Sequence, residues 1–223
     1  MLHRMTGISI AELGAEAEAL TAGAPEGEAL DAQAVALITL ATAVAVTSLD
    51  RRWIIHTIGR ALDAGATIAQ VQEVIGLASG LGVHSLMVSS AAVLDEAARR
   101  GMVDPGAPLD PERQVLWDRY VGEDPFWVAF SEETPGFLEA MLRLSPDTFV
   151  GFFDYCAIPW RSGAVLARVK ELAALACDAT PSHRFRPGFR VHLKNAIKLG
   201  VGRAAILQAL DIAAAAPEHR GTE

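Results

Sequence analysis

The sequence predicts an all-α protein, and three observations lead to that prediction. Alanine, which loses no side-chain entropy in a helix, is the dominant residue. Runs in which apolar and polar residues alternate, as they do in a half-buried strand, are almost absent. Five residues whose side chains can cap a helix stand directly before a proline, which suits the first helical position because its missing N–H costs nothing there. These five are Asp110, Asp124, Thr134, Ser145 and Thr180.

Further signals mark individual helices. The apolar run over residues 34–46 indicates a buried core helix. Gly65 and Gly200 each stand at the end of a predicted helix, where the left-handed closing position prefers glycine. Thr67 and Gln70 have the spacing of a capping box, so the next helix is expected to begin there.

Two parts of the chain repeat one another. Residues 53–77 and 189–210 each contain a helix, a glycine stop and a further helix. Aligning Gly65 with Gly200 sets one constant shift along the chain, called the glycine offset below. An apolar helix over 34–47 then corresponds to one near 166–177. One such unit cannot bury its apolar faces alone, whereas two units packed about a pseudo-twofold axis can. We therefore predict a duplicated helical bundle with two pseudo-symmetric repeats.

The predicted domain organisation follows from this repeat. Residues 1–30 are small and acidic, and we expect them to form an N-terminal arm. Residues 31–100 form the first predicted repeat, and residues 163–223 form the second, which holds the candidate site. Residues 101–162 are expected to join the two repeats through short proline-capped helices.

Composition narrows the class of protein. Hydrophobic residues make up 51% and charged residues 21% of the 223 residues, a balance typical of a globular protein. The formal net charge is −8 and no long basic run is present, which argues against a nucleic-acid partner. The run over 34–46 is too short to span a bilayer, so we expect no membrane partner.

The cysteines and the N-terminal residues point to the cytoplasm. Cys156 and Cys177 lie far apart without CxxC spacing, so a structural disulfide is not expected. The first residues lack the basic and apolar regions of a signal peptide. We therefore expect a cytoplasmic protein with free thiols.

The second repeat contains the residues that suggest a family. Lys170, Glu171 and Leu172 lie in an apolar helix, and His192 stands eight residues before Gly200. This arrangement resembles the carboxymuconolactone decarboxylase family and the related alkylhydroperoxidase D proteins. The resemblance implies an alkylhydroperoxidase D-like helical bundle that usually oligomerises, so a homo-oligomer is expected. It covers roughly residues 165–216 well and residues 34–79 loosely.

The sequence departs from the peroxidase branch of this resemblance. That branch has a CxxC pair before the histidine, whereas this chain has Phe185 and Gly188 at the two cysteine positions. Disulfide-based peroxide reduction therefore lacks its resolving thiol. In the first repeat, Thr57 stands where the second has His192, and no matching glutamate is present, so we expect that copy of the site to be degenerate.

Three residues are candidate catalytic groups. His192 lies on the apolar face of its helix and is either a general acid/base or a core histidine. Glu171 either orients His192 or acts as the base, and the alternative is an exposed carboxylate paired with Arg168. His183 follows Thr180 in the first turn of a predicted short helix, where the helix N-terminus would keep its imidazole neutral, and the alternative is a surface histidine.

Three further residues are candidates for substrate binding. Arg186 and Arg190 are four residues apart and, if helical, could clamp a carboxylate, although a solvated basic face is also open. Asn195 stands three residues after His192 and could bond substrate or cap a buried carbonyl. Cys177 is more typical of a small buried apolar residue than of a nucleophile.

The same residues also raise the question of a metal site. Glu171, His183 and His192 are a set of ligand types that metals use. Their spacing is not a recognised metal pattern, and the family resemblance implies neither a metal nor a cofactor, so we expect none.

The leading hypothesis is a cofactor-free, decarboxylase-like lyase that uses acid/base chemistry on a small carboxylate or lactone. Arg186 or Arg190 would hold a carboxylate, and His192 or His183 would protonate the enolate left by CO2 loss. Isomerisation and lactone opening would use the same groups. The alternatives are a thiol-dependent peroxidase and a non-catalytic binding or assembly protein with this fold.

Overall fold

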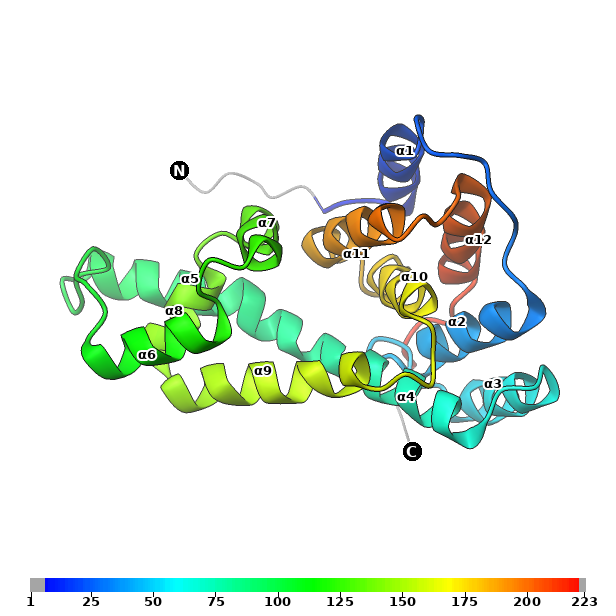
Figure 1. Ribbon diagram of the computed structural model, residues 1–223, viewed down its shortest axis with the longest axis horizontal. Helices are drawn as coiled ribbons and strands as arrows, with labels where there is room; N and C mark the ends of the chain where they lie inside the picture. Colours follow the sequence, from blue (N-terminus) through cyan, green and yellow to red (C-terminus); the bar gives the residue numbers. More distant parts are fainter. Residues whose placement is uncertain (1–6, 221–223) are drawn as a thin grey trace. The chain divides into compact units, whose positions relative to one another are not determined.

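The computed structural model describes residues 7–220, and this part of the chain is helical and contains no strand (Figure 1). The all-α prediction is therefore confirmed. The helices are α1 (Ile10–Leu20), α2 (Ala32–Val44), α3 (Arg51–Asp63), α4 (Ile68–Ser79), the 3-10 helix η1 (Gly80–Val83), α5 (His84–Arg99), α6 (Pro111–Tyr120), α7 (Pro125–Glu133), α8 (Phe137–Leu144), α9 (Pro146–Arg161), α10 (Ala167–Asp178), α11 (Arg186–Lys198) and α12 (Arg203–Ala214).

The chain divides into two compact units. Unit 1 comprises Met1–Leu81 and Pro159–Glu223, and unit 2 comprises Gly82–Ile158. The boundaries differ from the expected limits of the first repeat and the connection, because α5 packs on α8 inside unit 2.

Unit 1 contains two sets of three helices in the same order. The glycine offset relates the two sets helix by helix. It converts the first residues of α2, α3 and α4 into the first residues of α10, α11 and α12, and for α3 and α4 the last residues agree as well. The turns that precede α3 and α11 also match. Leu49 and Arg184, which the same offset relates, are the two non-glycine residues with positive φ in the described part of the chain, at 45° and 51°.

Contacts between the two sets follow the same offset. Helix α2 packs on α10, while α4 contacts α10 and α12 contacts α2 (Figure 1). The backbone N–H of Val165 donates to Glu73 Oε1 at 3.3 Å, and that of Leu30 donates to Gln208 Oε1 at 2.8 Å. The glycine offset relates both the donors and the acceptors of these two bonds. The third helix of each set thus fixes the start of the first helix of the other.

The core of unit 1 lies around α2 and α10. Helix α2 is apolar on all sides, which is typical of a fully buried helix, and Leu37, Ile38 and Leu40 are at most 2% exposed. Helix α10 contributes Leu172 and Leu175, with alanines between them. The small alanine side chains allow the helices to approach closely at these positions.

Most of the predicted helix ends are confirmed. Gly65 and Gly200 follow α3 and α11 with φ of 84° and 77°, and the Thr67 capping box opens α4. The proline pairs at Asp110, Asp124 and Ser145 each open a helix.

Two predicted helix starts are wrong. Thr134 ends α7, and α8 begins only after Gly136, whose φ is 75°. Thr180 lies in a turn because its hydroxyl donates back to the carbonyl of Cys177 at 3.0 Å instead of capping a new helix.

The described part of the predicted N-terminal arm is integrated into unit 1. Helix α1 packs on α12 and buries Leu13 and Ala17 (Figure 1). The segment after it closes on the start of α12, where the Arg203 N–H donates to the Pro25 carbonyl at 3.0 Å. The first helical N–H groups of α12, which lack a side-chain cap, thereby gain partners.

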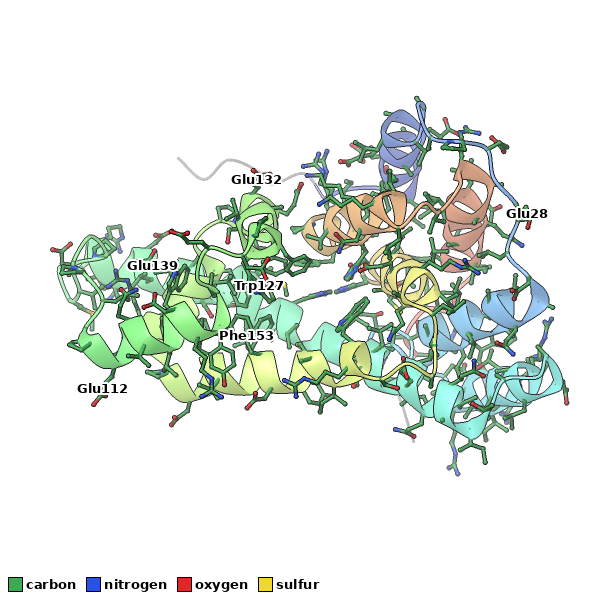
Figure 2. The ribbon with its side chains drawn as sticks, in the orientation of Figure 1. Glu28, Glu112, Trp127, Glu132, Glu139 and Phe153 are labelled. Atoms are coloured by element: carbon green, nitrogen blue, oxygen red, sulfur yellow. The ribbon has the colours of Figure 1, made fainter. Side chains whose placement is uncertain are left out.

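Unit 2 has a core of aromatic side chains. Figure 2 labels two of them, Trp127 of α7 and Phe153 of α9, whose rings meet edge to face with centroids 4.9 Å apart. Phe137 and Phe149 are fully buried in the same unit.

One helical run, Ile68–Arg99, is long and apolar enough to cross a membrane by length and composition alone. Its first part is α4, which buries Val71, Val74 and Glu73 and packs on α2 and α10. Within unit 1 this part of the run is therefore a core helix.

Candidate active site

Helices α10 and α11 bring three predicted residues together around one carboxylate. Glu171 is 7% exposed, and its Oε2 lies 2.7 Å from His192 Nδ1. The side-chain amide of Asn195, one turn further along α11, donates to Glu171 Oε1 at 3.2 Å. Glu171 is thus buried and bonded on both oxygens, so the surface pairing with Arg168 does not apply.

The contact with Glu171 determines which nitrogen of His192 is left for chemistry. Nδ1 donates to the carboxylate, and Nε2 makes no hydrogen bond with any residue in the described part of the chain. Burial favours the neutral imidazole, but the hydrogen bond and charge of Glu171, with the charge of Asp178, outweigh it and raise the pKa of His192. His192 is therefore suited to deliver a proton from Nε2.

A second histidine–carboxylate pair lies two turns along α10. His183 Nε2 is 3.6 Å from Oδ1 of Asp178, which stands seven residues after Glu171 and is 1% exposed. A Cβ at position 188 would overlap this carboxylate, so the glycine of α11 allows the close approach. Burial raises the pKa of Asp178 to about 7, although the charge of His192 opposes the shift.

The predicted environment of His183 is wrong. It lies in the turn over residues 180–183 and not in the first turn of a helix. Its pKa is lowered, as expected, but the cause is burial. His183 also stands beside Asp178 and not beside Glu171, so the structure pairs the two histidines with different carboxylates.

Arg186 and Arg190 share one face of α11, as their spacing predicts, and both engage a carboxylate of this chain. Arg186 Nε donates to Glu16 Oε2 at 2.9 Å, and Arg190 Nε donates to Glu16 Oε1. Glu16 belongs to α1 and its side chain is 13% exposed. The two arginines thus tie α1 to the start of α11.

Lys170, the neighbour of Glu171, anchors the segment that enters α10. It is 3% exposed and forms an ion pair with Glu73 of α4 at 2.8 Å. Its ammonium also donates to the carbonyls of Pro159 and Ser162, both at 2.8 Å, so all three of its protons are used. Glu73 bonds the Ser162 hydroxyl in turn.

This anchored segment places Trp160 beside His192. The two rings are parallel to within 9° with centroids 6.5 Å apart, at the outer end of the range for offset stacking. The ammonium of Lys170 lies 5.6 Å from the centroid of the same indole.

Sequence reasoning missed Asp178, Trp160, Glu73 and Glu16. Asp178 could have been found, because an acidic residue seven positions after Glu171 lies on the same helix face. Glu73 and Glu16 come from distant parts of the chain. Trp160 lies shortly before α10, but no local signal connects its ring with His192 of α11.

The cysteines do not have the properties of reactive thiols. Both are free, Cys177 is buried, and burial raises its pKa. Burial raises the pKa of Cys156 to about 11. A nucleophilic thiol needs the opposite shift.

Comparisons with known proteins agree with this fold. No protein-family model and no curated protein matches the sequence. Among solved structures, the chain is similar to a protein from Burkholderia xenovorans LB400 described as a "putative gamma-carboxymuconolactone decarboxylase subunit", at 29% identity and a TM-score of 0.71. The match covers 82% of this chain and 71% of the other. The molecule therefore has an all-α fold of the carboxymuconolactone decarboxylase type.

Proposed function

We propose that this protein is a cofactor-free enzyme of the carboxymuconolactone decarboxylase type that acts by acid/base chemistry on a small carboxylate or lactone. One observation chiefly supports this: a buried Glu171 bonds Nδ1 of His192 at 2.7 Å and leaves Nε2 for a substrate. The similarity to the Burkholderia structure supports the same class of reaction.

In a decarboxylation, the bond between the substrate carbon and its carboxylate breaks and CO2 leaves. The electron pair stays on the substrate as an enolate or dienolate. His192, protonated at Nε2, stabilises this negative charge and then transfers its proton to carbon. Glu171 holds the imidazole ring in place through Nδ1, and His192 regains its proton from solvent.

Arg186 and Arg190 are the proposed partners of a second carboxylate on the substrate. Their side chains are 49% and 34% exposed, so an anion can reach them. Glu16 already balances part of their charge, and a substrate carboxylate would have to share or displace it.

The two alternative functions differ in what they require. A thiol-dependent peroxidase needs a low-pKa cysteine beside a histidine, and the buried Cys177 argues against it. A non-catalytic binding protein would not need a buried Glu171 bonded to Nδ1 of His192.

The first test is turnover of 4-carboxymuconolactone, followed by ultraviolet absorbance and CO2 release. We expect His192→Ala to lower kcat/KM by about 100-fold or more, the usual contribution of a general acid. The matched control is His56→Ala, an exposed histidine of the first helix set. No turnover by folded wild-type protein, or equal turnover by His192→Ala, would contradict the assignment.

Glu171→Gln separates the roles of the two residues. The pKa of His192 should fall because the neutral amide no longer stabilises the imidazolium. If His192 is the acid, activity will then decline at a lower pH than in the wild type. An unchanged pH profile would remove Glu171 from this role.

We also propose that the two helix sets arose by internal duplication, with the first copy degenerate. The glycine offset places Thr57 and Ala36 at the positions of His192 and Glu171. Such a chain mimics a dimer of single repeats, and we propose that whole chains pair further into a cytoplasmic homo-oligomer.

A further inference from the structure

Buried side chains anchor the backbone on both sides of Trp160. Lys170 bonds the carbonyls of Pro159 and Ser162, on either side of it, and Glu73 bonds both the Ser162 hydroxyl and the Val165 N–H. Glu73 and Lys170 are themselves buried, with side chains 3% exposed.

Adjacent residues of α10 therefore hold the Trp160 backbone and the His192 ring. Lys170 holds the segment with Trp160, and Glu171 holds His192. The resulting rings are parallel to within 9°. Neither is closed off, since Trp160 is 39% exposed and the side chain of His192 is 21% exposed.

A planar group that lies on the indole is held parallel to the imidazole ring as well. A conjugated acid or an unsaturated lactone is flat, and its π-system gains stacking contacts on an indole face. A saturated chain of the same length is puckered and gains less.

We propose that Trp160 is a specificity-determining residue whose indole selects substrates with a planar, conjugated carbon skeleton and presents that skeleton to His192. This inference rests on the proposed acid/base function of the site. It adds the substrate class, because acid/base chemistry at His192 alone does not require a flat substrate.

The test compares two six-carbon dicarboxylates of equal charge. trans,trans-Muconate is planar and conjugated, whereas adipate is saturated, and both can be titrated calorimetrically into the full-length protein. We expect wild type to bind muconate about three- to tenfold more tightly than adipate, the size of an aromatic stacking gain. Trp160→Phe should keep most of this preference, and Trp160→Leu should lose it.

Trp53→Leu is the matched control, because Trp53 belongs to α3 of the first helix set and should leave the preference unchanged. Circular dichroism checks that each variant is folded. Equal binding of the two acids by wild type, no binding of either acid, or a preference that survives in Trp160→Leu would overturn the inference.

Turnover is a separate readout. A preference for muconate that depends on Trp160, without decarboxylation of 4-carboxymuconolactone, would reject the proposed reaction. It would leave the role of Trp160 in selecting planar ligands in place. Turnover that depends on His192, without any preference for muconate, would support the proposed reaction and reject the role of Trp160.

Discussion

At the scale of single residues, helix α10 places two carboxylates on one face and gives each a histidine. Glu171 raises the pKa of His192, while burial lowers the pKa of His183 beside Asp178. Near neutral pH, one histidine is thus suited to donate a proton and the other to accept one. Two nearby titratable groups whose pKa values are shifted in opposite directions are a common basis for acid and base roles.

Asp178 allows a stability prediction with a defined sign. Its pKa is raised from 3.8 to about 7 in the folded protein, so folding favours the protonated form. That contribution to stability is fully present below about pH 4 and is lost as pH rises through 7, at about 1.4 kcal/mol per pH unit. Asp178→Asn, which stays neutral, should match wild type at pH 4 and exceed its free energy of unfolding at pH 8.

Urea unfolding at several pH values measures this difference. Asp211→Asn, at an exposed position of α12, is the control for removing one negative charge. Parallel profiles of wild type and Asp178→Asn would show that Asp178 ionises in the folded protein as it does in the unfolded chain.

At the scale of elements, α1 illustrates how a weak helical signal becomes ordered structure. Its capping box at Ser9 and Glu12 is local, but the apolar face that it buries consists only of Leu13 and Ala17. Because this buried face is small, the hydrogen bonds from Arg186 and Arg190 to Glu16 help to hold α1 against α11.

Glu16→Gln tests whether the two arginines also bind a substrate. The substitution removes the competing carboxylate, so the Kd for muconate should fall several-fold. The free energy of unfolding should fall by about 1 kcal/mol or less, as for other partly exposed ion pairs. Glu18→Gln, on the same helix and 62% exposed, is the control. An unchanged Kd would assign the arginines to holding α1 only.

At the scale of the whole molecule, the first and third helices of the two sets are interlocked. Glu73 and Gln208 are related by the glycine offset, and each accepts a backbone N–H at the start of a helix from the other set. Only Glu73 meets a buried lysine. At this shared position, Glu73 of the first set therefore forms an ion pair, whereas Gln208 of the second set accepts a hydrogen bond as a neutral amide.

Removing one partner of this buried pair should be costly. Burial opposes the charged form of Glu73, but the hydrogen bonds from Lys170, Ser162 and Val165, with the charge of Lys170, outweigh it and lower the pKa of Glu73, so Glu73 is charged at neutral pH. Glu73→Ala would leave Lys170 charged and unpaired in the core, at an expected cost of about 3–5 kcal/mol. Glu73→Leu with Lys170→Met should cost much less, because neither charge remains. Urea unfolding of both variants checks this, and equal losses would contradict it.

Much of the fold of unit 1 could be predicted because its signals are local. Gly65 and Gly200 stop helices through their own backbone freedom, and Thr67 with Gln70 caps within one turn. Thr180 of unit 1 and Thr134 of unit 2 each precede a proline, as the helix-opening residues do, but Thr180 lies in a turn and Thr134 ends a helix. At those two positions the threonine hydroxyl donates to a carbonyl of the preceding helix. The residue type alone does not determine whether a threonine bonds the preceding helix or caps the next one.

By itself the sequence determined the helical class and the offset between the two helix sets. Spacing within one or two helices is enough for these, because a helix converts sequence spacing directly into direction. His192 and Glu171 were candidates through the family resemblance, and the structure showed that they are partners. The tertiary structure decided which charges meet: Glu73 with Lys170 at a separation of 97 residues, and Glu16 with Arg186 at 170. Such pairs depend on how helices pack, and packing is determined by the buried faces of the whole unit and not by the charged residues themselves.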